Sequence, residues 1–88
     1  MRIWKVTLDV TDRQNINIPQ GAKLLTVQVQ EGRDPQLWFL CNENEPMSTR
    51  IIAIYGTGNP IPDDPGEYIS TFQEFNGELV WHVFEIGR

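Results

Sequence analysis

Hydrophobic and polar residues alternate along most of this chain with a period of two, which is the period of a β-strand that buries one face. The clearest example runs from Leu24 to Gln30, where Leu25, Val27 and Val29 alternate with Thr26, Gln28 and Gln30. The same pattern predicts strands over residues 2–10, 14–18, 24–30, 35–42, 49–55, 67–75 and 78–86. In the first of these, Trp4, Val6, Leu8 and Val10 are expected on one face.

Short turns separate the predicted strands, and sequential strands joined in this way form antiparallel sheets. Asn76-Gly77 has the composition of a two-residue type I′ hairpin turn, which needs positive φ at both positions. Residues 31–34, Glu-Gly-Arg-Asp, predict a second tight hairpin. The expected fold is therefore all-β: a small antiparallel sandwich or barrel of about seven strands, without a significant helix, in a single domain over residues 1–88.

Three of the predicted strands are apolar on both faces: Leu37 to Cys41, Ile51 to Tyr55 and Leu79 to Ile86. A strand of a monomeric sandwich usually shows one face to water, so the second apolar face needs a cover. One explanation is a closed barrel whose outer face is partly covered by long loops. The other is a homo-oligomer, at least a dimer, and self-association would also compensate for the small core of a chain of 88 residues.

Charge and composition narrow the classes of function. The net charge of −5 argues against binding to a nucleic-acid polymer, although not against binding of a small anion. No stretch approaches the roughly 18 apolar residues of a membrane helix, and the N-terminal segment alternates like a strand rather than a signal peptide. Cys41 is the single cysteine, which fits a reducing cytoplasm, and we expect it to pack as a small apolar residue.

The residues with catalytic potential are few. His82 is the single histidine, and one histidine with one cysteine does not make a structural zinc site. A Cys41–His82 dyad would lack a glycine elbow or a helix N-terminus to activate the thiol. Asp63 and Asp64 stand between two prolines, where we expect a turn in which Asp64 accepts local backbone hydrogen bonds. We therefore expect no catalytic residue, no metal and no cofactor.

The most distinctive segment is the loop from Tyr55 to Gly66, YGTGNPIPDDPG. Its glycines and prolines exclude a helix or a regular strand, and the prolines favour a single loop conformation. Gly56 and Gly58 would let backbone N–H groups approach a ligand, and Thr57 and Asn59 would add side-chain donors. The alternative is a tight turn that only leads the chain out of the strand.

Other polar residues could complete a site at this loop. Arg50 lies on the strand that leads into the loop and could meet a phosphate. His82 lies on an apolar strand, and Gln28 and Gln30 could contact a base or ribose edge. The alternatives are a surface arginine, a core or interface histidine and solvated glutamines. The predicted ligand-binding residues are Gln28, Gln30, Arg50, Gly56, Thr57, Gly58, Asn59 and His82.

Four segments occur in this order along the chain: TDRQNINIPQGAKLLTVQVQ, LWFL, IYGTGNPIPDDPGEYISTF and LVWHVFE. With these segments the chain resembles a group of small phage and prophage proteins of about this length, and the resemblance covers nearly all of it. The chain departs from the group at Asn59, where GTGHP is commoner than GTGNP. Asn59 keeps a donor but loses imidazole chemistry, which weakens the case for catalysis.

Phage proteins of this size include counter-defence sponges, which are small β-rich homo-oligomers that sequester immune nucleotide signals of the host. By analogy, the resemblance implies a nucleotide-binding anti-defence protein that captures a cyclic dinucleotide or an ADP-ribose derivative without turnover, in the cytoplasm of an infected bacterium. The alternative is a module that docks on a host or virion protein through its apolar second face. A sponge predicts a pocket with donors and an aromatic residue, whereas a docking module predicts a broad, flat apolar patch. The single histidine and the absence of a metal-ligand cluster disfavour a phosphodiesterase.

Overall fold

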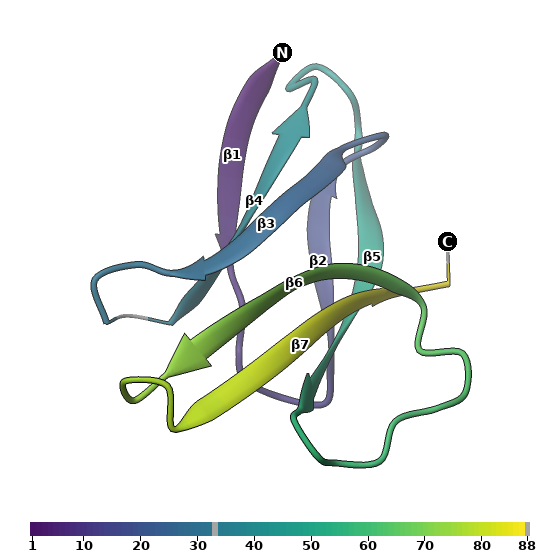
Figure 1. Cartoon of the computed structure of the whole chain (residues 1–88). Coiled ribbons are helices and arrows are strands. Elements are labelled where there is room, and N and C mark those ends of the chain that lie inside the picture. The colour runs from purple at the N-terminus through teal and green to yellow at the C-terminus, as the bar shows by residue number, and fades with distance from the viewer. Residues whose placement is uncertain (33, 88) are drawn as a thin grey trace.

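The computed structural model describes residues 1–32 and 34–87. This part of the chain forms seven strands and no helix, so the prediction of an all-β protein is confirmed (Figure 1). The strands are β1 (Arg2–Thr7), β2 (Arg13–Pro19), β3 (Lys23–Val29), β4 (Pro35–Cys41), β5 (Met47–Gly56), β6 (Glu67–Glu74) and β7 (Leu79–Ile86). A membrane-spanning helix is absent from the described residues.

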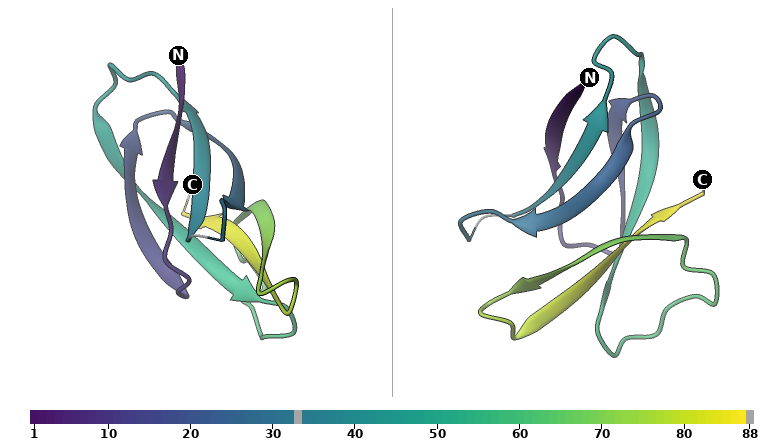
Figure 2. Two further views of the ribbon diagram at one scale, coloured as in Figure 1. Left: turned by 90° about the vertical axis from the view of Figure 1, so that its left-hand side faces the viewer. Right: turned by 45° about the horizontal axis from the view of Figure 1, so that its top comes forward.

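The strands form two separate antiparallel sheets. Sheet A has the order β1-β4-β3, and sheet B has the order β2-β5-β7-β6. The connections β1–β2, β2–β3 and β4–β5 pass from one sheet to the other, which places the sheets face to face (Figure 2). No strand of sheet A pairs with a strand of sheet B among the described residues, so the fold is a sandwich and not a closed barrel.

The core lies between the two sheets and follows the alternation of the sequence. In β4, which the sequence shows to be apolar on both faces, Leu37, Phe39 and Cys41 point inward, and each is at most 3% exposed. In β5 the inward set is Arg50, Ile52 and Ile54, of which one is charged. The buried apolar cluster consists of Leu8, Ile16, Ile18, Ala22, Val27, Leu37, Phe39, Cys41, Ile52, Ile54, Phe72 and Val83.

Two strands contain an irregularity that the alternation did not predict. The pairing of β3 with β4 shifts between Leu24 and Thr26, so a bulge reverses the facing of the residues before it. Leu24 packs against the core, whereas Leu25 is 39% exposed, and the prediction that Leu25 faces inward with Val27 is wrong. A second shift, between Tyr68 and Ser70, lets Ile69 pack against the core.

The first strand is shorter than predicted. β1 ends at Thr7 rather than at Val10. Leu8 is nevertheless fully buried, and its N–H donates to the Pro35 carbonyl at 2.8 Å. Val10 is 39% exposed in the turn that leads to β2, so the prediction that it continues the face of Trp4, Val6 and Leu8 on the strand is wrong.

The β6–β7 hairpin is present, but its turn is longer than predicted. Glu74 pairs with Leu79, so four residues rather than two connect the strands. Phe75 and Asn76 have φ values of 53° and 57°, and Gly77 follows with 88°. Positive φ therefore begins at Phe75, one residue before Asn76-Gly77. The predicted two-residue type I′ turn at Asn76-Gly77 is replaced by this longer turn. The β3–β4 connection turns through Glu31 and Gly32, both with positive φ, and Arg33 of the predicted hairpin lies outside the described residues.

The two sheets also meet along one side of the sandwich, where β3 lies beside β6 (Figure 1). The Ser70 hydroxyl of β6 donates to the Val27 carbonyl of β3 at 3.2 Å and lies 3.2 Å from the Thr26 hydroxyl. Ser70 is only 7% exposed, so these hydrogen bonds satisfy polar groups that the packing removes from water.

The strands with two apolar faces are arranged differently in the two sheets. On sheet A, the outer face of β4 carries Trp38 and Leu40, and Lys5 lies over the Trp38 ring at 5.3 Å. On sheet B, β5 and β7 are neighbours, and their outward residues are direct cross-strand partners: Ile51 with Ile86, Ala53 with Phe84 and Tyr55 with His82. The apolar second faces of β5 and β7 therefore merge into one surface.

Candidate functional site

The loop over residues 57–66 leaves β5 and is fastened to β7 at its start. The Thr57 N–H donates to the Val80 carbonyl at 3.1 Å, and the Asn59 N–H donates back to the Gly56 carbonyl at 3.1 Å. A Cβ on Gly56 would lie 2.9 Å from Asn59 Nδ2 and 3.2 Å from the Trp81 ring, so glycine is needed for the Asn59 amide to fold over the chain here. The loop begins as a tight, internally bonded turn.

This turn reduces the number of backbone N–H groups that the GTGNP segment can offer to a ligand. The N–H groups of Thr57 and Asn59 are used by the fold itself, and only the remaining groups of the GTGNP segment could turn to a ligand. Further along, Asp64 Oδ1 accepts from the Gly66 N–H at 3.3 Å, which is the local turn expected for this aspartate.

His82 is hydrogen-bonded at both ring nitrogens on the outer face of sheet B. Its Nε2 lies 2.7 Å from Thr57 Oγ1, and its Nδ1 lies 3.1 Å from Thr71 Oγ1 of β6. Thr71 Oγ1 is in turn 2.7 Å from the Tyr68 hydroxyl, and Thr57 Oγ1 donates to the Val80 carbonyl at 3.3 Å. His82 thus connects the loop to β6.

One orientation of the hydrogens satisfies every group in this network. Because Thr57 Oγ1 donates to the Val80 carbonyl, it accepts from His82 Nε2–H. Nδ1 is then an acceptor for the Thr71 hydroxyl, which accepts from the Tyr68 hydroxyl. The imidazole therefore holds the loop in place and has no free nitrogen for chemistry on a ligand.

A pocket of about 200 Å³ lies between the loop and the outer face of sheet B. Three aromatic rings form much of its wall: Phe84 packs edge-on against Tyr55 at 5.9 Å between ring centroids and against Tyr68 at 5.6 Å. The lining residues are Tyr55, Gly56, Thr57, Gly58, Asn59, Ile61, Tyr68, His82 and Phe84. The structure therefore brings the predicted residues 56–59 and His82 together and adds an aromatic wall.

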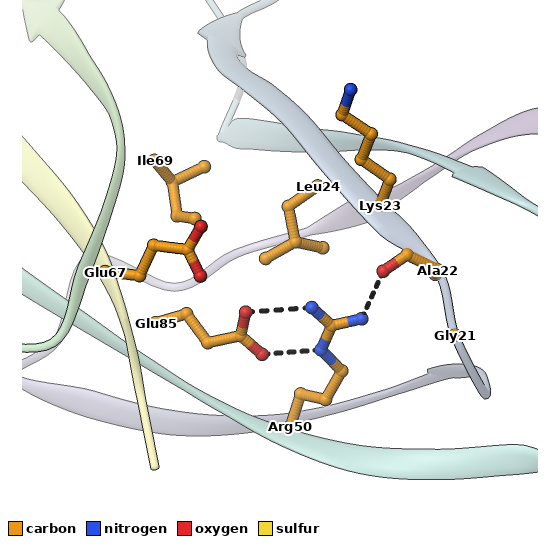
Figure 3. A pocket seen from close by; sticks show the side chains of 8 residues that line it. All are labelled: Gly21, Ala22, Lys23, Leu24, Arg50, Glu67, Ile69 and Glu85. Atoms are coloured by element: carbon orange, nitrogen blue, oxygen red, sulfur yellow. Dashed lines mark hydrogen bonds and ion pairs between the residues drawn. The ribbon is translucent and has the colours of Figure 1, made fainter. Parts of the chain in front are cut away.

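Arg50 lies in a different cavity, shown in Figure 3, which has a volume of about 250 Å³. Its Nε and Nη2 donate to the two carboxylate oxygens of Glu85 at 2.5 and 2.8 Å, and its Nη1 donates to the Ala22 carbonyl at 2.5 Å. Arg50 is 8% exposed and Glu85 is 2% exposed. Arg50 is thus neither a surface residue nor a neighbour of the loop, because its inward phase in β5 directs it into the sandwich.

The two predicted glutamines are also away from the loop pocket. Gln28, on β3 of sheet A, donates to the Thr26 hydroxyl at 3.1 Å. Gln30 accepts from Lys5 Nζ at 2.7 Å. Neither residue lines the pocket that contains His82. The eight predicted residues are thus divided between the loop pocket, the Arg50 cavity and the surface of sheet A.

The sequence reasoning missed two aromatic residues of the pocket wall, Phe84 and Tyr68, and one partner of His82, Thr71. Phe84 could have been found, because it lies two residues from His82 on the same face of one strand. Tyr68 and Thr71 could not, because their position depends on the register of β6 with β7 and on the shift between Tyr68 and Ser70.

The other candidates for chemistry are not arranged for it. Cys41 is 1% exposed in the core, whereas His82 faces outward on sheet B, so the two do not form a dyad. In the part of the chain that the structure describes, no three His, Cys, Asp or Glu residues are grouped so that they could hold a metal ion.

Comparison with known proteins gives one match. Residues 1–87 match the model of a family described as a domain of unknown function, DUF7352. The chain belongs to this family. No curated protein and no solved structure matches it. Family membership supports treating residues 1–87 as one unit, and the loop pocket and the Arg50 cavity both lie within it.

Proposed function

We propose that this protein binds a small, planar, nucleotide-type ligand in the loop pocket and does not convert it. The observation that supports this proposal is the aromatic wall of Tyr55, Tyr68 and Phe84 beside a loop that His82 holds in place. Aromatic rings at the wall of a pocket offer stacking surface to any base, and stacking is worth about 1–3 kcal/mol for each base. Tyr68 is 57% exposed, so its ring is accessible to a ligand.

The chemistry of the lining favours a base over a phosphate. No Lys or Arg is found among the described residues that line the pocket, and the net charge of the chain is −5. The guanidinium of Arg50 is neutralised by Glu85 in the other cavity. Binding energy therefore comes from ring contacts and from hydrogen bonds of Asn59 and the loop backbone, while phosphates face the solvent.

The proposal of binding without turnover rests on the state of the polar groups. Both nitrogens of His82 are hydrogen-bonded to threonine hydroxyls. No carboxylate lines the pocket among the described residues, so no general acid or base accompanies the imidazole. These features support a site that binds a ligand and does not convert it.

The resemblance to small phage proteins extends the proposal to a biological role. A stoichiometric binder of cyclic dinucleotides or ADP-ribose derivatives would lower the free concentration of an immune signal in the cytoplasm of an infected bacterium. This role requires affinity and a sufficient number of copies, and no catalytic group.

A second candidate function is docking on another protein. The merged apolar surface of β5 and β7, with Ile51 38% exposed, favours it. In this function the aromatic residues would contact side chains of a partner and no nucleotide would bind.

The test is a thermal-shift screen of the purified chain against cyclic dinucleotides, ADP-ribose and its cyclic isomers, followed by calorimetry. A nucleotide present at 100 times its Kd should raise the free energy of unfolding by about 2.7 kcal/mol. Chromatography of the recovered nucleotide should show it unchanged. Cleavage of the nucleotide would refute the non-enzymatic proposal, and no response to any of these compounds would leave docking as the better function.

A further inference from the structure

The outer face of sheet B is almost free of charge. Its outward strand residues are Arg13, Asn15, Asn17, Met47, Thr49, Ile51, Ala53, Tyr55, Tyr68, Thr71, Gln73, Val80, His82, Phe84 and Ile86. Arg13, on the outermost strand β2, is the one residue among them with a formal charge, although the chain has 12 acidic and 7 basic residues. Depletion of charge is a property of the central part of protein interfaces.

Sheet A does not share this property. Its outer face carries Lys5, which lies over the Trp38 ring and donates to Gln30, and Lys23, the cross-strand partner of Leu40. The lysine stem covers the apolar surface of β4 and keeps the ammonium group in water. On sheet B, the 57–66 loop covers the apolar face only beside Tyr55, Tyr68 and His82. The rest of that face, around Ile51, has no such cover from the described residues.

The loop pocket is continuous with this face and is small for a complete site. Its volume of about 200 Å³ is below the roughly 300–1,000 Å³ of pockets that enclose a small ligand. Tyr68 and Ile61 at its rim are 57% and 47% exposed. A nucleotide bound to one copy would thus contact one aromatic wall and leave its other side in water.

We propose that the outer face of sheet B packs against the same face of a second copy, and that this contact closes the loop pocket over the ligand. A two-fold contact brings the same patch of both copies together, so acidic side chains in the patch of a chain of charge −5 would repel those of the second copy. The outward strand residues of sheet B include no acidic side chain. The molecule measures 39 × 33 × 15 Å, so its broad side has room for the roughly 800 Å² that each partner of a stable dimer buries.

Two isoleucines provide a matched test of which face is used. Ile51 is 38% exposed on the outside of sheet B, and Ile3 is 60% exposed on the outside of sheet A. The wild-type chain should sediment at twice its 10.2 kDa mass. Ile51→Glu should return a monomer, because it places two carboxylates in the contact, and Ile3→Glu should remain a dimer. Circular dichroism checks that both variants are folded.

Closure of the pocket has its own readout, and this part rests on the proposed function. Ile51 does not line the pocket, so any loss of nucleotide affinity in Ile51→Glu reflects loss of the second copy. With cyclic di-AMP and ADP-ribose as probes, we expect at least a tenfold loss for Ile51→Glu and none for Ile3→Glu. Should Ile51→Glu fail to fold, spin labels on Ile51→Cys and Ile3→Cys should give the shorter distance between copies at residue 51.

The outcomes separate the two proposals. A wild-type chain that stays monomeric at its highest soluble concentration overturns the contact, even if it binds a nucleotide. A dimer that Ile3→Glu dissociates and Ile51→Glu does not, or a shorter label distance at residue 3, also overturns it. Unchanged nucleotide affinity in a monomeric Ile51→Glu overturns the closure of the pocket. A dimer of the expected geometry that binds neither probe supports the contact and counts against the proposed function.

Discussion

Arg50 of β5 and Glu85 of β7 lie diagonally across neighbouring strands, and their side chains meet inside the sandwich in two hydrogen bonds of 2.5 and 2.8 Å. Both residues point inward because they are in phase with Ile52 and Val83. A third hydrogen bond, from Arg50 to the Ala22 carbonyl, ties the pair to the turn that leads into β3 of sheet A. The ion pair therefore connects the two layers.

We predict that Arg50→Met lowers the free energy of unfolding by about 3–5 kcal/mol, because it leaves the Glu85 carboxylate buried without a partner. Urea denaturation measures this loss. The double variant Arg50→Met/Glu85→Met should recover most of the lost free energy of unfolding, because it leaves no buried charge without a partner. The control is Arg2→Met, which breaks the exposed pair with Glu43 and should change the stability by at most about 1 kcal/mol. Equal effects of Arg50→Met and Arg2→Met would contradict this role.

Two glycines with positive φ should respond differently to alanine. A Cβ on Gly66, at φ 99°, would lie 2.3 Å from the Glu85 carbonyl oxygen, whereas a Cβ on Gly58, at φ 85°, meets nothing within 4 Å. Gly58→Ala should cost on the order of 1 kcal/mol, the strain of the backbone alone. Gly66→Ala should cost on the order of 3–5 kcal/mol, because backbone must move. Thermal unfolding compares the two, and similar losses would mean that the close approach at Gly66 is absent.

Thr57→Val removes the hydroxyl that accepts from His82 and donates to Val80, with little change of shape. We expect faster amide hydrogen exchange in residues 57–66 and a loss of stability of about 0.5–1.5 kcal/mol. The matched control is Thr49→Val on β5, the strand that leads into the loop, which removes a hydrogen bond to Asn17. Exchange in the loop should not change in this control. Unchanged exchange in Thr57→Val would show that the network does not hold the loop.

Tyr68→Ala should weaken nucleotide binding by about 1–3 kcal/mol, because it removes an accessible ring from the pocket wall. Phe75→Ala removes a ring that is 67% exposed on the β6–β7 hairpin and lines no part of that pocket. Calorimetry with the nucleotide identified by the screen should therefore distinguish the two variants. Equal affinities would move the binding site away from the aromatic wall.

Phe75 itself is held at φ 53°, which is an unfavourable conformation for a bulky side chain. Asparagine tolerates this conformation better, so Phe75→Asn should raise the free energy of unfolding by about 0.5–1 kcal/mol. Phe75→Ala lacks the short polar side chain that stabilises asparagine at positive φ and should bring no comparable gain. Urea denaturation of both variants checks the difference, and a loss of stability in Phe75→Asn would show that the ring packs in solution.

The sequence predicted best what depends on neighbouring residues. Alternation located all seven strands and placed Leu37, Phe39 and Cys41 on one common face, because side-chain facing follows directly from a period of two. Where a bulge interrupts the period, as at Leu25, the same reasoning assigned the wrong face. The length of the β6–β7 turn was missed because Phe75 adopts a φ that its residue type disfavours.

The site was predicted only in part because most of it depends on pairing between distant strands. The loop glycines and His82 were recognised from composition, and the structure places them together. Arg50 was expected at the loop because the strand that carries it leads into the loop. Its partner in the structure is instead Glu85, which is 35 residues away along the chain. No local pattern in the sequence shows that two oppositely charged residues will form a buried ion pair. The contact between the rings of Tyr68 and Phe84 could not be predicted from a local pattern either.

The hydroxyl of Ser70 also bears on how this protein behaves when it is crowded. Outer strands of a sheet are templates for further strands, and chains that add to them grow into fibres without limit. At β3, part of that template is already occupied, since the Val27 carbonyl accepts from Ser70 of the other sheet. The two-fold contact between sheet faces that we propose would, by contrast, stop at two chains. The placement of one serine thus removes part of the β3 edge from the groups that could pair with another chain in open-ended polymerisation.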